Sequence, residues 1–319
     1  MSSPASENIP RQRRRRSSPR STAHDALSSV KHTAQRSLLL LWDELPAWRR
    51  DNAYIVSGYR QSNPSLTHVL CSLTTLHNES VNIWSHLFGA LLALATGLYL
   101  YCVVHPRYRY ATPRDVFVFG CFFAGAAVCL GMSATYHTIL HHSEPVARWG
   151  NKLDYTGIVF LIVGSFVPAL YYGFYCHPTL LTSYLSAICL LGVACTAVSW
   201  LERFRTPQWR PYRTAIFVAL GLSSVFPVVH GIALYGYREL QESMSIDWTI
   251  AQGVLYIAGA LLYAVRWPER SLPGTFDIWG SSHQIFHMFV LMAAVTHFCG
   301  LAKAFDNHHA MAGYRCQAL

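Results

Sequence analysis

The chain contains seven runs of apolar residues, each long enough to cross about 30 Å of hydrocarbon as a helix. No Lys, Arg, Asp or Glu occurs inside any of these runs. The predicted spans are residues 83–104, 116–136, 155–176, 180–201, 214–237, 248–265 and 282–302. Backbone groups in lipid must pair within the protein, and the period-two pattern of a membrane barrel is absent, so the runs predict helices. We therefore expect an all-α fold, a bundle of seven transmembrane helices.

The composition agrees with a chain that lies mostly in lipid. Only 13% of the 319 residues are charged and 52% are hydrophobic, whereas a soluble domain has about 25% charged residues. This excludes a disordered chain and disfavours a soluble enzyme. No signal peptide is recognisable, so the plasma membrane and the endoplasmic reticulum both fit. The nine cysteines show no C-x-x-C pair and no framework spacing, so no structural disulfide is expected, although Cys71, Cys102, Cys176 and Cys316 remain candidates.

Four segments are predicted along the chain. They are a disordered basic cytoplasmic tail (1–36), a short amphipathic juxtamembrane segment (37–82), the seven-helix membrane domain (83–305) and a short C-terminal tail (306–319). Within the second segment, residues 38–50 are expected to form a short interfacial helix or hook. The first segment holds eight basic and two acidic residues. Its "RQRRRR" run is typical of a nuclear signal or a nucleic-acid arm, but beside a membrane domain we expect contact with anionic lipid and no nucleic-acid partner.

The basic residues between the spans predict the orientation. With a cytoplasmic N-terminus, the cytoplasmic side receives the basic tail and the Arg-rich connection around residues 203–213. Fewer basic residues fall on the other side, and because cytoplasmic loops carry the excess of Lys and Arg, we expect a cytoplasmic N-terminus and an extracytoplasmic C-terminus.

Polar residues at membrane depth are costly and indicate either a functional site or a contact between helices. Those near the predicted span ends are Glu79, Asn82, His86, Ser133, His137, Asp154, His283 and His287. The start of span one, the end of span two and the starts of spans three and seven all lie on one side of the membrane. All eight residues can therefore meet in one leaflet.

Two of the histidines, His283 and His287, are spaced i, i+4, and His137 adds a third imidazole from another helix. Three imidazoles, with Asp154 nearby to hold a water molecule, have the composition of a catalytic zinc site. The alternative is a polar network that only holds helices together. Spacing alone does not choose between them.

The other histidines are expected to be structural or solvated. His230 and His297 lie alone in apolar helices, where a hydrogen bond between helices is the expected role. The remaining ones that fall in predicted loops or the tail include His77 and His308, which we expect to face solvent.

Three blocks resemble the signature blocks of the progestin and adipoQ receptor family, also called haemolysin III-related. They are "HNESVNIWSHLFG" (77–89), the stretch 133–176 beginning "SATYHTILHH", and "SSHQIFHMFV" (281–290). The similarity is greatest to the adiponectin receptors and their fungal Izh-type relatives, and it extends from about Leu41 to about Ala304. It implies a seven-helix fold with zinc as cofactor. It also implies zinc ligation by His137, His283 and His287, catalytic roles for Asp154 and Ser133, and motif positions at Glu79, Asn82 and His86.

The resemblance implies two functions that the residues do not separate. One is ceramidase-type hydrolysis of a lipid amide, with a ceramide-like membrane lipid as substrate and a role in lipid and zinc homeostasis. The other is a receptor that responds to an extracellular protein ligand and uses zinc only structurally. Zinc transport is disfavoured because no internal repeat is visible and the polar residues cluster in one leaflet.

Overall fold

The computed structural model of the chain describes residues 39–108, 110–310 and 316. Seven of its helical segments are long and apolar enough to span a membrane. They consist of α3 (Ser80–Tyr99) with η4 (Leu100–Val104) and η5 (His105–Arg107), α4 (Pro113–Ile139), α5 (Glu144–Gly173), α6 (Pro178–Ser199), η7 (Pro207–Trp209) with α7 (Arg210–Leu222) and α8 (Val225–Tyr235), α10 (Ile246–Val265), and α11 (Ser282–Ala310). The expected seven-helix bundle is confirmed, and the protein is an integral multi-pass membrane protein.

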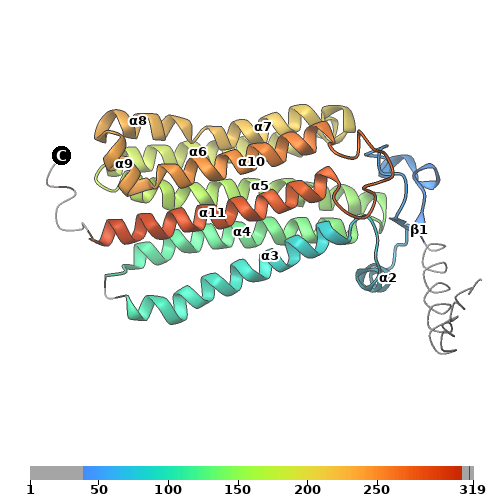
Figure 1. Cartoon of the computed structure of the whole chain (residues 1–319), viewed down its shortest axis with the longest axis horizontal. Coiled ribbons are helices and arrows are strands. Elements are labelled where there is room, and N and C mark those ends of the chain that lie inside the picture. The colour runs from blue at the N-terminus through green and yellow to red at the C-terminus, as the bar shows by residue number, and fades with distance from the viewer. Residues whose placement is uncertain (1–38, 109, 311–315, 317–319) are drawn as a thin grey trace, which may run out of the picture. The chain divides into compact units, whose positions relative to one another are not determined.

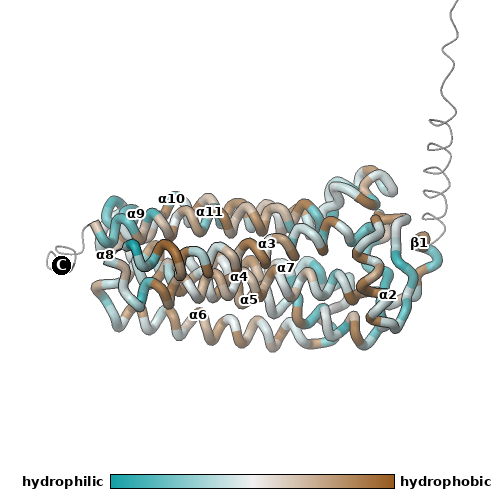
Figure 2. Tube along the Cα trace, turned by 90° about the horizontal axis from the view of Figure 1, so that it is seen from below, coloured by the Kyte–Doolittle hydropathy of each residue, from teal (hydrophilic) through white to brown (hydrophobic). Residues whose placement is uncertain are grey.

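The remaining elements are short. They are β1 (Leu39–Leu40), η1 (Trp42–Glu44), η2 (Ala47–Arg49), β2 (Tyr59–Arg60), α2 (Leu66–Cys71), η3 (Ser72–Thr74), η6 (Glu202–Arg205) and α9 (Tyr237–Met244). The long helices lie lengthwise beside one another, with α2 at one end and α9 at the other (Figure 1). Hydrophobic residues dominate the middle of these helices and hydrophilic ones gather near their ends, as Figure 2 shows.

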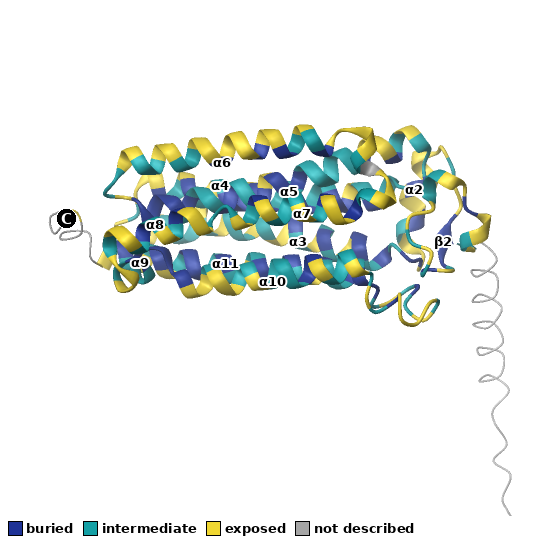
Figure 3. Cartoon of the chain, turned by 90° about the horizontal axis from the view of Figure 1, so that it is seen from above, coloured by how far each residue is buried: buried dark blue, intermediate teal, exposed yellow. Residues whose placement is uncertain are grey.

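The centre of the bundle is formed by α4 and α5. In the most apolar stretch of each of these two helices, 44% of the residues are buried. In the corresponding stretches of the first and sixth spans only 6% are buried. Figure 3 shows the same contrast, with buried residues in α4 and α5 and exposed ones along α6. Exposed leucines such as Leu92 and Leu190 face outward, as expected for a surface in contact with lipid.

Close contact between α4 and α5 depends on two glycines. A Cβ atom added at Gly125 would lie 2.6 Å from the carbonyl oxygen of Phe160, and one at Gly164 would lie 2.6 Å from that of Cys121. Small residues let two membrane helices approach until their backbones touch. The same contact sets the position of Asp154 on α5 relative to His137 on α4.

One expectation about a boundary is wrong. Helix α5 begins at Glu144, so Asp154 lies inside the helix and not at its start. The polar stretch 144–154 lacks the hydropathy of a span, yet a proline in the first turn and the Glu144–Arg148 ion pair support a helix there. Residues 39–50 form β1 and two 3-10 turns, because Pro46 interrupts any longer helix. Of the two alternatives for this segment, this agrees with the hook and not with the single helix.

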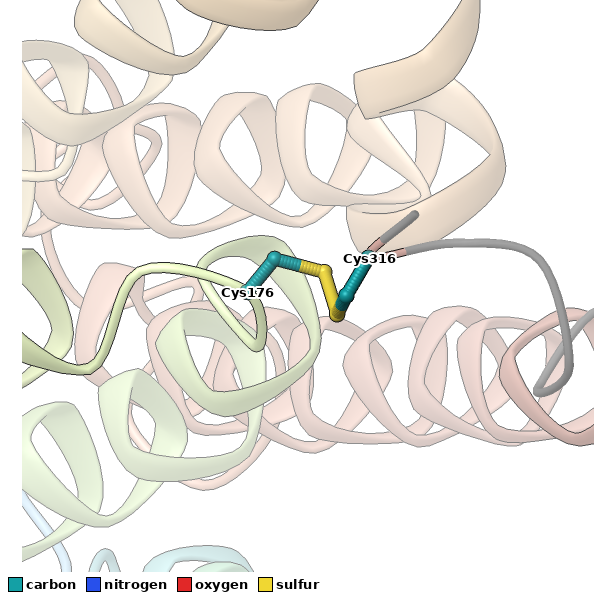
Figure 4. The surroundings of a disulfide bond; sticks show 2 residues. All are labelled: Cys176 and Cys316. Carbon is teal, nitrogen blue, oxygen red and sulfur yellow. A yellow bond between two sulfur atoms is a disulfide. The ribbon is translucent and has the colours of Figure 1, made fainter. Parts of the chain in front are cut away.

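A disulfide joins Cys176, just after α5, to Cys316, 140 residues further along the chain (Figure 4). The spacing of the cysteines did not indicate this bond, and the expectation of no structural disulfide is wrong. The predicted tail 1–36 lies outside the described residues. The cytoplasmic location of the N-terminus stays a prediction.

Candidate metal centre

Three histidines from two helices meet inside one end of the bundle. His137 lies in the last turn of α4, and His283 and His287 lie in the first two turns of α11. One nitrogen of each ring lies within 4.8 Å of the others, and His137 and His287 are buried. Nε2 of His137 is 3.1 Å from Nε2 of His283. The arrangement predicted from sequence parity is therefore present.

The second nitrogen of two of these rings is held by a neighbouring group on the polypeptide. Nδ1 of His137 donates a hydrogen bond to Oε2 of Glu79 at 2.8 Å, and Nδ1 of His287 donates to the carbonyl oxygen of Asn82 at 3.2 Å. With a proton on Nδ1, each neutral ring keeps a lone pair on Nε2. The lone pairs are thus on the nitrogens free to bind a cation.

The donor set fits a metal ion. A tetrahedral ion with metal–nitrogen distances of 2.0–2.1 Å needs its ligand nitrogens about 3.3 Å apart, close to the separation of His137 and His283. Outer carboxylate and carbonyl partners that orient metal-binding imidazoles are a regular feature of such sites. The cluster could therefore hold a metal through His137, His283 and His287.

The motif residues of α3 surround this cluster. Asn82 donates from Nδ2 to Oε2 of Glu79 at 2.7 Å, so Glu79 receives bonds from both α3 and α4. The ring of His86 stacks on that of His287 with centroids 3.6 Å apart and an interplanar angle of 5°. Burial alone would raise the pKa of Glu79, but the hydrogen bonds from His137 and Asn82 hold it below its ordinary value.

Asp154 and Ser133 lie beside the histidines. The side chain of Ser133 is buried and hydrogen-bonds to Asp154. Both residues line the same cavity as His86, His283 and His287. The structure thus brings together every site residue that the sequence suggested.

Two cavities meet at this point. An apolar cavity of about 230 Å³ runs between the helices, and a polar pocket of about 400 Å³ opens at the end of the bundle near α2. Asp154, Tyr155, Arg213, Tyr263 and His283 line both. The histidine cluster therefore sits at the junction of an apolar and a polar compartment.

The segment before α3 supports the site, and sequence reasoning missed this role. Arg60 in β2 donates to the carbonyl oxygens of His137 at 2.6 Å and Thr138 at 3.2 Å. These are carbonyls at the C-terminal end of α4, where a cation is favourable. Arg60 is 3% exposed, so it fixes the end of the helix that carries His137.

The loop before α11 is held in a similar way by buried carboxylates. Glu269 is fully buried and accepts bonds from the backbone and hydroxyl of Ser282, at the start of α11. Asn52 donates to the same carboxylate at 3.1 Å, and Asp277 accepts from Val56 and Ser57. Residues 52–57 and the loop thereby position the helix that carries His283 and His287.

Two of the histidines expected in solvent are buried. His77 is 1% exposed and His308 is 5% exposed. Burial and the nearby Arg60 lower the pKa of His77 to about 3. Position in a predicted loop or tail was the only basis for the expectation. His77 lies in a connection that folds back on the bundle, whereas His308 lies in the last turn of α11, which continues beyond the predicted span.

A seven-helix membrane protein with a buried imidazole cluster at one end is the class that fold and site define. A sequence profile of the haemolysin-III related family matches residues 74–298. The chain belongs to this family.

Individual relatives agree with this assignment. The chain is 42% identical over 286 residues to the adiponectin receptor protein of Drosophila melanogaster, covering 88% of this chain but only 64% of the fly protein. It is 43% identical over 271 residues to the ADIPOR-like receptor IZH2 of Saccharomyces cerevisiae, covering 85% of each chain. Heptahelical transmembrane protein 4 of Arabidopsis thaliana is 32% identical, with 82% and 86% covered.

Proposed function

We propose that this chain is a zinc-dependent lipid amide hydrolase of the ceramidase type, acting in lipid and zinc homeostasis. The observation that carries the proposal is the position of the histidine cluster at the junction of the two cavities. An amide placed there has an apolar cavity for its acyl chain and a polar pocket that admits water. A ceramide-like lipid satisfies both compartments.

Zinc is the metal that suits the donors. Imidazole nitrogens favour zinc, whereas Mg²⁺ and Ca²⁺ prefer oxygen ligands. Three protein ligands leave one coordination position open, as in catalytic zinc sites. When bound, zinc supplies a Lewis acid for the carbonyl and lowers the pKa of a bound water towards 7.

The residues of the chain perform the remaining steps. Asp154 lies between the polar pocket and the histidines and accepts a proton from the attacking water. The hydrogen bond of Ser133 to Asp154 supports a role in holding that carboxylate in position.

The test is fatty-acid release from ceramide by purified protein in nanodiscs, with bound zinc quantified in the same samples. We expect Asp154→Asn to lose release while zinc stays bound. Asp306→Asn, which changes an exposed carboxylate on α11, is the control and should match wild type. Full turnover by Asp154→Asn would overturn the role of Asp154, and a zinc-loaded wild type that releases no fatty acid would overturn the hydrolase.

The receptor alternative rests on the contacts that join three helices. Glu79 and Asn82 belong to the start of α3 and bond to His137 on α4 and His287 on α11. A metal at that point would fasten α3, α4 and α11 without chemistry, and the fly and yeast relatives are named receptors. This alternative requires that an extracellular protein ligand alters signalling in cells while purified zinc-loaded protein lacks hydrolysis.

Orientation and membrane contacts complete the proposal. The basic residues favour a cytoplasmic N-terminus, which places the metal centre in the cytoplasmic leaflet. The Arg-rich tail would then contact anionic lipid. The plasma membrane and the endoplasmic reticulum both supply such a surface.

A further inference from the structure

The apolar cavity contains three polar side chains far from the metal centre. Gln252 and Tyr256 lie one turn apart on α10, and His297 lies on α11. All three line the cavity that begins at the histidine cluster. None of them has a role in the proposed chemistry.

The three residues occupy one layer of the bundle. Along α10, Gln252 and Tyr256 lie between Trp248, which packs near Gly300, and Gly259, which packs near Phe289. His297 lies between Phe289 and Gly300 on α11. Because α10 and α11 run antiparallel through these contacts, the three side chains lie at about the same depth.

The polar atoms of this layer lack partners among the described residues. They are the amide oxygen of Gln252, the hydroxyl of Tyr256 and Nε2 of His297, and each is inaccessible to solvent. His297 is 4% exposed, and its ring also hydrogen-bonds to the backbone of Ser165 on α5. The backbone carbonyl is the acceptor open to a ring N–H, so Nε2 keeps a lone pair.

A buried polar atom without a partner is unfavourable, and an ordinary saturated acyl chain offers none of these atoms a hydrogen bond. Two of the three groups are acceptors and the third is a hydroxyl. A single group that can hydrogen-bond to all three must both donate and accept hydrogen bonds, and an alcohol does so.

We propose that Gln252, Tyr256 and His297 form a subsite for a hydroxyl group carried part-way along the acyl chain of the lipid. This rests on the proposed function, because it assumes that the carbonyl end of the lipid lies at the metal centre. His297 is ten residues beyond His287, about 15 Å along the helix, which corresponds to roughly twelve carbons of an extended chain. The preferred substrates are thus lipids of mid-chain hydroxy fatty acids.

The test compares fatty acids that differ only in the hydroxyl. Full-length zinc-loaded protein in phosphatidylcholine nanodiscs is titrated with 12-hydroxystearate, 3-hydroxystearate and stearate, and Kd is measured by displacement of a fluorescent fatty acid. We expect 12-hydroxystearate to bind about tenfold more tightly than stearate, and the 3-hydroxy isomer to resemble stearate.

Variants assign the effect to residues. His297→Phe and Gln252→Leu should each bring the preference for 12-hydroxystearate over stearate close to unity. Thr296→Val is the matched control, since Thr296 is adjacent on α11 but bonds to the carbonyl of Met292 and does not line the cavity. It should keep the full preference. A preference that survives both cavity variants would overturn the assignment.

The outcomes separate this inference from the proposed function. Equal binding of the three acids to wild type would overturn the hydroxyl subsite but not the proposal that the cavity binds an acyl chain. Buried water would then be the hydrogen-bond partner of the three polar atoms. No binding of any fatty acid would overturn both. Selective binding of 12-hydroxystearate without amide hydrolysis would support the subsite and overturn the hydrolase. The comparison of the three fatty acids uses wild-type protein alone, so its result does not depend on whether any variant folds.

Discussion

The carboxylate of Glu79 lies 2.8 Å from Nδ1 of His137, and the side-chain amide of Asn82 bonds to the same oxygen. This contact joins the residue just before α3 to the last turn of α4. It fixes which ring nitrogen of His137 carries the proton and increases the electron density on the other. Glu79 is half-buried, so the interaction is only partly screened by solvent.

Replacing Glu79 by Gln should weaken zinc binding. Loss of an outer-shell carboxylate reduces metal affinity by about ten- to a hundredfold in characterised sites. Competition with a chelator of known affinity measures the zinc Kd in detergent. Glu144→Gln is the control because Glu144 pairs with Arg148 at the exposed start of α5. An unchanged Kd for Glu79→Gln would show that the contact does not tune the metal centre.

Removing the metal should destabilise the bundle. A ligand bound only by the folded state, at a concentration a thousand times its Kd, adds about 4 kcal/mol of stability. We expect chelation to lower the melting temperature of wild type by several degrees and to leave His137→Ala unaffected. His230→Ala should respond like wild type, since His230 bonds to Tyr184 as a contact between α8 and α6. Equal responses in all three proteins would contradict a metal bound at His137.

Acid should destabilise the protein through His141. This ring is fully buried, and burial, with a contribution from Arg60, lowers its pKa to about 3. The unfolded chain, with a pKa near 6.5, therefore takes up this proton first as the pH falls. The stability is complete above about pH 6.5 and is lost progressively below it.

The measurement is the melting temperature from pH 7.5 to pH 5. We expect His141→Gln to lose roughly 2–4 °C less than wild type over this range. His105→Gln, at a partly exposed position in η5, should follow wild type. Parallel curves for His141→Gln and wild type would show that His141 is not held neutral by the fold.

The Cys176–Cys316 bond offers a test of orientation. The substitution Cys176→Ser breaks the bond and should leave Cys316 as a free thiol. If the C-terminus is extracytoplasmic, a membrane-impermeant maleimide added outside intact cells should then label Cys316. The experiment is done with Cys102→Ser, because Cys102 is also exposed. Cys71, at the other end of the bundle, should be labelled only after the membrane is opened. Labelling of Cys71 in intact cells would reverse the orientation.

The number of helices and the meeting of the three histidines were predictable because they depend on local signals. Seven uncharged apolar runs show the spans, and the alternation of span direction places His137 and His283 on one side. Arg60 and Glu269 were not predictable as supports, since their partners lie 77 and 13 residues away in polar segments without periodicity. Helix α5 was predicted too short because hydropathy does not detect a polar helix that extends beyond lipid.

His137 is separated from His283 by 146 residues, and this determines when the histidine cluster can form during synthesis. A nascent chain that has inserted its first six helices carries His137, Glu79 and Asp154 but neither of the two histidines on α11. One imidazole does not make a zinc site. With the proposed ligands, metal acquisition waits until α11 has entered the membrane. Zinc loading would then mark the completed polypeptide, and a product truncated before residue 283 would leave the ribosome unable to capture the ion.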